Sequence, residues 1–215
     1  MAQTTFDNRT TLRVTVYSHR LLKEFDPTLV VTGCKDAYPH DHGFAAATLQ
    51  PDAINHRADA CVYDTDTGTR ELIDFTFTCA SLSSGKDGAQ PSSHADAKDD
   101  DKVKQYAKEF PGFGPDSEPV SLVILSMMER HGSWSKGTIA YWDARVKAAH
   151  DREVANMEFP TPLSVLTRRV RQTLAVALWR SNAVHIAQLY RKALHGAQRV
   201  GSKVATPAAG PGGGL

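Results

Sequence analysis

The sequence feature that most constrains the fold is a pair of β-rich runs separated by a short turn that contains glycine. The runs "ADACVYD" (58–64) and "RELIDFTFT" (70–78) flank the segment "TDTGT" (65–69). Two such runs around a glycine-containing turn are typical of a β-hairpin. Because alternate residues of a strand share a face, the second strand places Asp74 and Thr76 together, opposite its isoleucine and phenylalanines.

Two aspartates of this hairpin form a candidate metal site. Asp74 lies inside the apolar run "LIDFTF", where an aspartate is disfavoured by β-propensity and costly to bury without a partner or a metal. With Asp59 on the neighbouring strand, it can converge on one Mg²⁺ or Mn²⁺ ion, since Mg²⁺ needs only one or two carboxylates besides substrate phosphate. Asp64 and Asp66, by contrast, fit the turn itself. From the residues alone, an ordinary pair of aspartates remains an alternative to a metal site.

The chain before the hairpin has weaker patterns. Residues 1–20 alternate in "TTLRVTVYSH" and are interpreted as a short strand or a leader. Residues 21–57 are rich in Pro, His and Gly and are predicted to be mostly loop, apart from a short strand in "DPTLVVTG" (26–33). We expect residues 1–55 to form an N-terminal segment with a partial helix or strand.

After the hairpin the pattern becomes mainly helical. Residues 80–101 are predicted to be an exposed loop, followed by a short helix in "DDKVKQYAKEF" and a buried strand in "EPVSLVILS" (118–126). Residues 137–157 are predicted to be helical, and a long helix follows from Pro162. The sequence therefore predicts an α/β domain with a small mixed β-sheet flanked by helices. Its core would span 56–200, with a disordered tail at 201–215.

Charge is distributed unevenly along the chain. Eight basic and no acidic residues follow Glu158, so the first 158 residues carry 17 basic and 24 acidic residues, a net charge of −7. The acidic first part of the chain suits a cation site, and the basic rear segment suits a polyanion such as DNA. Arg168, Arg169 and Arg171 are the candidate phosphate contacts. A basic solvated helix face is the alternative explanation.

The compartment is suggested by cysteine usage and by the absence of targeting signals. Three cysteines do not make a disulfide framework. There is no signal-peptide pattern and no apolar run long enough to span a membrane. We therefore expect an intracellular protein, nuclear or cytoplasmic, with no membrane partner. Trp134 and Trp142 are interpreted as packing residues rather than base-stacking ones.

The order of these motifs resembles a known family of nucleases. "HRADACVYD…RELIDFTFT", then "KVKQYA", then a buried strand that ends in Glu129 and Gly132, is similar to the PD-(D/E)xK-like (restriction-endonuclease-like) domain of non-LTR retroelement polyproteins. The long closing helix with its Asn-Ala pair at 182–183 also resembles that family. The resemblance covers roughly 56–195 and implies a restriction-endonuclease-like fold, a retroelement-derived chain that belongs to a larger polyprotein, and action on DNA.

The resemblance also implies roles for individual residues. Asp59 and Asp74 would be the metal-binding catalytic carboxylates, with Tyr106 and Glu129 in support. The second motif here is a variant, Asp-x-Thr, in which Thr76 stands in place of the family's lysine. Lys102 of the following helix would then supply the catalytic lysine.

Two functions remain open at this point. The first is a metal-dependent DNA endonuclease that hydrolyses phosphodiester bonds. The second is a nucleic-acid-binding or structural module that keeps the fold and has lost cleavage, as the missing motif lysine would allow.

Overall fold

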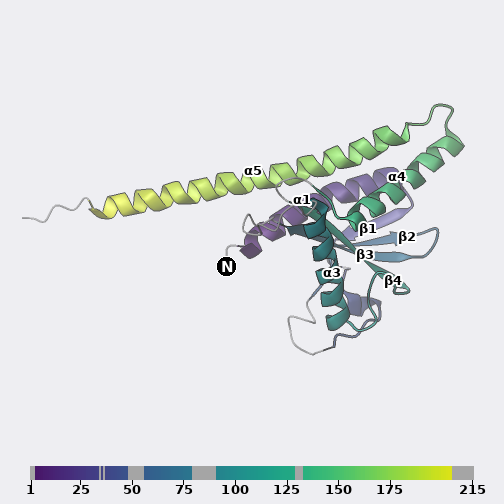
Figure 1. The fold of residues 1–215 in the computed structure, drawn as a ribbon, viewed down its shortest axis with the longest axis horizontal. Helices are drawn as coiled ribbons and strands as arrows, with labels where there is room; N and C mark the ends of the chain where they lie inside the picture. The colour runs from purple at the N-terminus through teal and green to yellow at the C-terminus, as the bar shows by residue number, and fades with distance from the viewer. Residues whose placement is uncertain are drawn as a thin grey trace, which may run out of the picture.

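The computed structural model describes residues 3–33, 35, 37–47, 56–78, 91–128 and 133–204, which form a four-stranded mixed sheet flanked by helices. The strands lie in the order β1-β2-β3-β4. The first three are antiparallel and the fourth runs parallel to the third. Their bounds are β1 Leu29–Gly33, β2 Ala60–Asp64, β3 Arg70–Thr78 and β4 Val120–Met128. The predicted α/β class with a small mixed sheet and a long C-terminal helix is confirmed (Figure 1).

The hairpin formed by β2 and β3 agrees with the sequence pattern, and Ala60 pairs with Ile73 in its register. The Asp64 carboxylate accepts hydrogen bonds from two backbone N–H groups of the turn, at 2.9 and 3.3 Å. Gly68 takes a φ of 71°, a conformation that glycine adopts without strain. The role of Asp64 in forming the turn is thereby confirmed.

Helix α3 (Pro91–Glu109) covers one face of the sheet. Because side chains alternate along a strand, Cys61 and Leu72 point to this face, where they pack with Tyr106 and Phe110. Tyr106 and Phe110 are fully buried. This helix therefore places its own side chains directly over the middle strands.

The other face of the sheet is covered by α1 (Gln3–Phe25) and α4 (Lys136–Asn156), and α5 (Leu163–Val204) packs across these two helices. Figure 1 shows α5 lying over α1 and α4 and extending well beyond them. Trp134 and Trp142 are buried in this core, so their interpretation as packing residues is confirmed. No described helix combines the length and apolar character that a bilayer crossing requires.

The interpretation of residues 1–20 as a strand or leader is wrong, because α1 is a helix from residue 3 onward. Its buried side chains, Val14, Leu21, Leu22 and Phe25, recur at the spacing of helical turns. Packing against the sheet and against α5 outweighs the β-preference of the local threonines and valines. The segment before residue 56 thus supplies α1 and β1 to the same core.

Two helix boundaries also differ from the prediction. α3 begins at Pro91, so the loop predicted over 80–101 is wrong from residue 91; residues 79–90 lie outside the described part. Ala95 is fully buried and Asp96 accepts the Lys136 N–H at 2.7 Å, so packing against the start of α4 extends the helix. α5 continues to Val204, beyond the predicted start of the tail, and residues 205–215 are not described.

Candidate active site

Asp59 and Asp74 face each other across the β2–β3 hairpin. Continuing the strand register by one pair from Ala60 and Ile73 sets Asp59 opposite Asp74. The Asp59 N–H donates to the Ile73 carbonyl at 2.8 Å, and the Phe75 N–H donates to Asp59 Oδ2 at 2.8 Å. Both the backbone and the carboxylate of Asp59 are therefore fixed to β3, on the sheet face that α3 covers.

The two carboxyl groups are close enough to influence each other's ionisation; Asp74 is buried and Asp59 is partly exposed. Burial, followed by the charge of Asp74, raises the pKa of Asp59 to about 8, although the Phe75 N–H and Lys102 act in the opposite direction. Two carboxylates at such close range do not both ionise readily without a cation. Near neutral pH and without a metal, the pair therefore retains a proton.

Helix α3 brings a lysine and a tyrosine to this pair. The Lys102 ammonium lies 3.0 Å from Asp74 Oδ2, and the lysine is partly buried. Tyr106, one turn later on the same helix face, is fully buried, and its pKa is raised by burial and then by the charges of Asp74 and Asp59. The structure thus brings four of the residues singled out in the sequence to one place.

The donor atoms present fit a hard divalent cation. Within the described part of the chain, Asp74 Oδ2 and the Tyr106 hydroxyl are buried without a hydrogen bond of good geometry. The same part contains no group of three or more His, Cys, Asp or Glu side chains placed to hold a metal ion. Two carboxylates without a third ligand suit Mg²⁺ or Mn²⁺, since Mg²⁺ keeps several waters and takes substrate phosphate as a further ligand.

Thr76 continues the polar row along β3. It pairs with Ser126 of β4, and both residues are buried on the face that α3 covers. Thr76 therefore lies beside the carboxylate pair, where the resemblance places it. Glu129, the other supporting residue expected from the sequence, lies outside the described residues.

The sequence patterns did not reveal His56 and Glu109. The His56 ring stacks on the Tyr106 ring with centroids 4.5 Å apart, and His56 Nδ1 contacts the Glu109 carboxylate. Both residues are partly buried. Glu109 follows Tyr106 by one helical turn, and His56 immediately precedes the hairpin, but only the folded chain shows that they meet.

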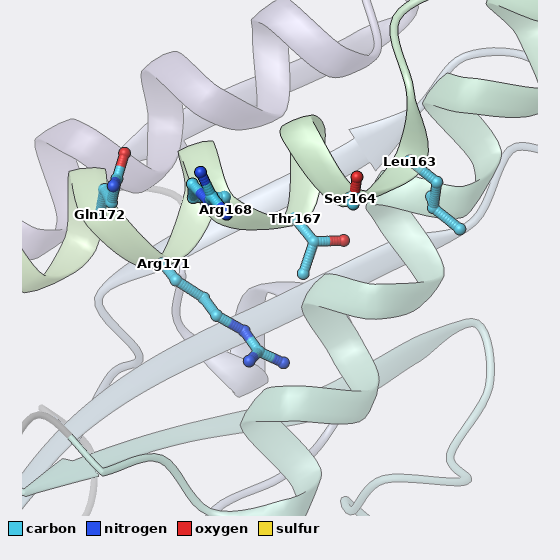
Figure 2. A pocket seen from close by; sticks show the side chains of 6 residues that line it. All are labelled: Leu163, Ser164, Thr167, Arg168, Arg171 and Gln172. Atoms are coloured by element: carbon cyan, nitrogen blue, oxygen red, sulfur yellow. The ribbon is translucent and has the colours of Figure 1, made fainter.

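The three arginines of α5 lie apart from the carboxylate pair. α5 packs on α1 and α4, whereas Asp59 and Asp74 lie on the sheet face that α3 covers. Arg169 pairs with Glu24 of α1 at 2.6 Å. Arg168 and Arg171 are exposed and line a surface pocket of about 480 Å³ on α5, where Arg171 extends away from the helix (Figure 2).

The raised pKa of Asp59 predicts a pH-dependent stability in the absence of divalent metal. The unfolded carboxyl ionises near pH 4 and the folded one near pH 8. The folded state therefore holds an extra proton between these values, so its stability falls as pH rises from about 4 to 8 and then levels off. Asp59→Asn keeps an acceptor for the Phe75 N–H and removes this loss.

Urea unfolding of both proteins in EDTA, from pH 4 to 9, measures the effect. We expect the variant to gain about 1–3 kcal/mol over the wild type by pH 8, after allowance for solvent screening of the partly exposed pair. A difference between the two proteins that does not change with pH would contradict the coupling.

No protein-family model, curated protein or solved structure matches this chain. The side chains around Asp59 and Asp74 are therefore the basis for assigning a function.

Proposed function

We propose that this protein is a metal-dependent DNA endonuclease, in which Asp59 and Asp74 hold Mg²⁺ or Mn²⁺. The observation that carries the proposal is the pair of facing carboxylates, buried Asp74 and partly exposed Asp59, with the Lys102 ammonium 3.0 Å from Asp74. Full ionisation of such a pair without a bound metal costs stability, because two like charges would then be held together away from water. Perturbed carboxylates of this kind are concentrated at functional sites.

The surrounding residues have distinct roles in this proposal. Asp59 and Asp74 bind the cation, which when present would neutralise charge on a phosphodiester and activate water for hydrolysis. Lys102 is the one described cation within ion-pair distance of Asp74, and it would stabilise the charge that develops on the phosphate or orient the attacking water. Tyr106 and Thr76 form the buried polar wall beside them.

The order of the motifs supports the same proposal. Asp59, Asp74, Lys102 and Tyr106 follow one another along the chain as in the retroelement nucleases that the sequence resembles, and they meet at one site. Since Thr76 replaces the motif lysine on β3, a lysine from α3 offers the missing positive charge. A retroelement origin within a larger polyprotein is part of this proposal.

A second candidate is a nucleic-acid-binding module without cleavage. The Lys102–Asp74 ion pair favours it, because this pair already neutralises one of the two carboxylates without a metal. Exposed Arg168 and Arg171 would remain available to phosphates in either case.

Nicking of supercoiled plasmid DNA decides between the two candidates. The wild type is expected to produce open circles with Mg²⁺ or Mn²⁺ and none with EDTA. The double variant Asp59→Asn/Asp74→Asn, purified in parallel, is expected to be inactive, whereas Asp66→Asn in the exposed hairpin turn stays active. Equal nicking by the wild type and the double variant would reveal a contaminant, and DNA binding without nicking would select the second candidate.

A further inference from the structure

A row of exposed apolar side chains runs along α5 on the side away from the core. It consists of Val176, Trp179, Ala183, Ile186 and Tyr190, which we call the α5 stripe. Trp179, Ile186 and Tyr190 are 65, 65 and 66 % exposed, which is high for large apolar residues on one helix face.

The α5 stripe lies roughly opposite the face by which α5 joins its own domain. The buried face is formed by Leu166, Val170, Leu174 and Ala177, which pack with α1 and α4. At about 100° per residue, the direction from the helix axis to Trp179 is close to 180° from the direction to Val170. Packing within the described chain therefore leaves the α5 stripe open to solvent.

The spacing of the α5 stripe is that of a helix-pairing seam. Its members are separated by three, four, three and four residues, which is the heptad pattern of two helices that wrap around each other. The small Ala183 between the larger Trp179 and Ile186 leaves space for a side chain of a facing helix. A docked helix would also cover Tyr190 at the far end of the row.

Charge indicates what kind of helix fits. The charged residues within and next to the α5 stripe, Arg180, Arg191 and Lys192, are all basic, and no acidic residue follows Glu158, so a second copy of α5 would bring like charges together. An acidic helix would instead complement this segment. The stripe lies on the side of α5 away from α1 and α4, whereas Asp59 and Asp74 lie on the sheet face that α3 covers, so the two sites share no residue.

We propose that the α5 stripe docks an acidic, amphipathic α-helix of a partner protein. The apolar face of that helix packs against Trp179, Ile186 and Tyr190, and its acidic residues are attracted by the net positive charge of this part of α5. This inference does not depend on the nuclease proposal, because it uses no residue of the carboxylate site.

Synthetic helices are the probes for this surface. Three helical peptides of about 28 residues, or four heptads, are compared. The first has leucine along its contact face and glutamate on both sides of that face. The second replaces the glutamates with lysines, and the third replaces the leucines with serines. Trp134 and Trp142 are buried, so exposed Trp179 reports docking by a blue shift of its fluorescence. Titration calorimetry with the full chain gives the affinity.

The leucine–glutamate peptide is expected to bind with a Kd of about 10 µM or tighter and to shift the Trp179 emission. Ile186→Ser combined with Tyr190→Ser should weaken binding at least about tenfold. Val154→Ser, which changes an exposed apolar residue on α4, should leave the affinity unchanged. Circular dichroism verifies that the variants stay folded.

Four results would overturn the proposal. They are no binding of the leucine–glutamate peptide, equal binding of the lysine-flanked or serine-seam peptide, and a concentration-dependent dimer of the wild type that the double serine variant loses. The fourth is a single-stranded oligonucleotide that shifts the Trp179 emission and displaces the acidic peptide.

Discussion

Asp74→Asn is expected to eliminate Mg²⁺-dependent nicking while leaving the fold at least as stable as the wild type. Loss of one of the two carboxylate ligands weakens cation binding. We therefore expect the nicking rate to fall about 1,000-fold, which corresponds to a rise of roughly 4 kcal/mol in the activation free energy. Stability should not fall, because Asp59 can then ionise beside Lys102 without a second buried negative charge. Activity and stability are thereby separated.

Single-turnover nicking and urea unfolding, performed on the same preparations, measure the two effects. Asp66→Asn is the matched control, since Asp66 is an exposed carboxylate of the same hairpin. Asp74→Asn could instead retain more than about a tenth of the wild-type rate, which corresponds to a rise of less than about 1.4 kcal/mol in the activation free energy. That result would show that the Asp74 carboxylate is not a metal ligand.

Lys102→Met is expected to reduce both activity and stability. The ammonium lies 3.0 Å from Asp74, so its removal leaves that buried carboxylate without its partner and should cost about 1–3 kcal/mol at neutral pH. The nicking rate at saturating DNA should fall about 100-fold, because charge developing on the phosphate loses a stabilising cation. The apparent KM for DNA should change much less, because one interior lysine contributes little to binding of a long polyanion.

Two substitutions sharpen this test. Lys104→Met removes a neighbouring exposed lysine of α3 and should affect neither rate nor stability. Lys102→Arg keeps the charge but changes its shape and reach, so it should restore most of the stability and only part of the rate. If Lys102→Met and Lys104→Met had equal effects, Lys102 would contribute only its positive charge to DNA attraction, with no specific role at the reacting phosphate.

The parts of the fold that follow from the sequence are those in which local preference and packing agree. In the hairpin, a turn aspartate and a glycine with positive φ coincide with strand-forming runs on both sides, and β3 spans the predicted residues. The apolar residues on the buried face of α5, from Leu166 to Leu178, also recur at helical spacing in the sequence, and the structure buries them.

The errors arose where packing overrides local preference. The threonines and valines of residues 10–16 favour strands locally, yet α1 exists because Val14, Leu21 and Leu22 cover the sheet. The early start of α3 depends on contact with α4, which lies far along the chain. Such contacts leave no periodic signal in the segment that they stabilise.

In the candidate site, too, some residues can be predicted from the sequence and others only from the folded chain. An aspartate inside an apolar strand stands out in the sequence, so Asp74 and the neighbouring Asp59 are candidates from the hairpin, and the resemblance favours a metal site over an ordinary pair of aspartates. The direction of Lys102 depends on how α3 crosses the sheet, and spacing does not determine it. His56 and Glu109 lie 53 residues apart, and only their contact in the folded chain reveals them.

Calorimetric titration of Mn²⁺ into the wild type at pH 7, in two buffers of different ionisation enthalpy, tests the cation site most directly. If Asp59 and Asp74 form the site, one ion binds per chain and about one proton is released, because the raised pKa of Asp59 keeps it protonated until the metal arrives. Asp59→Asn should bind more weakly and release no proton. Binding without proton release, or binding equally strong in that variant, would contradict a metal site at this pair.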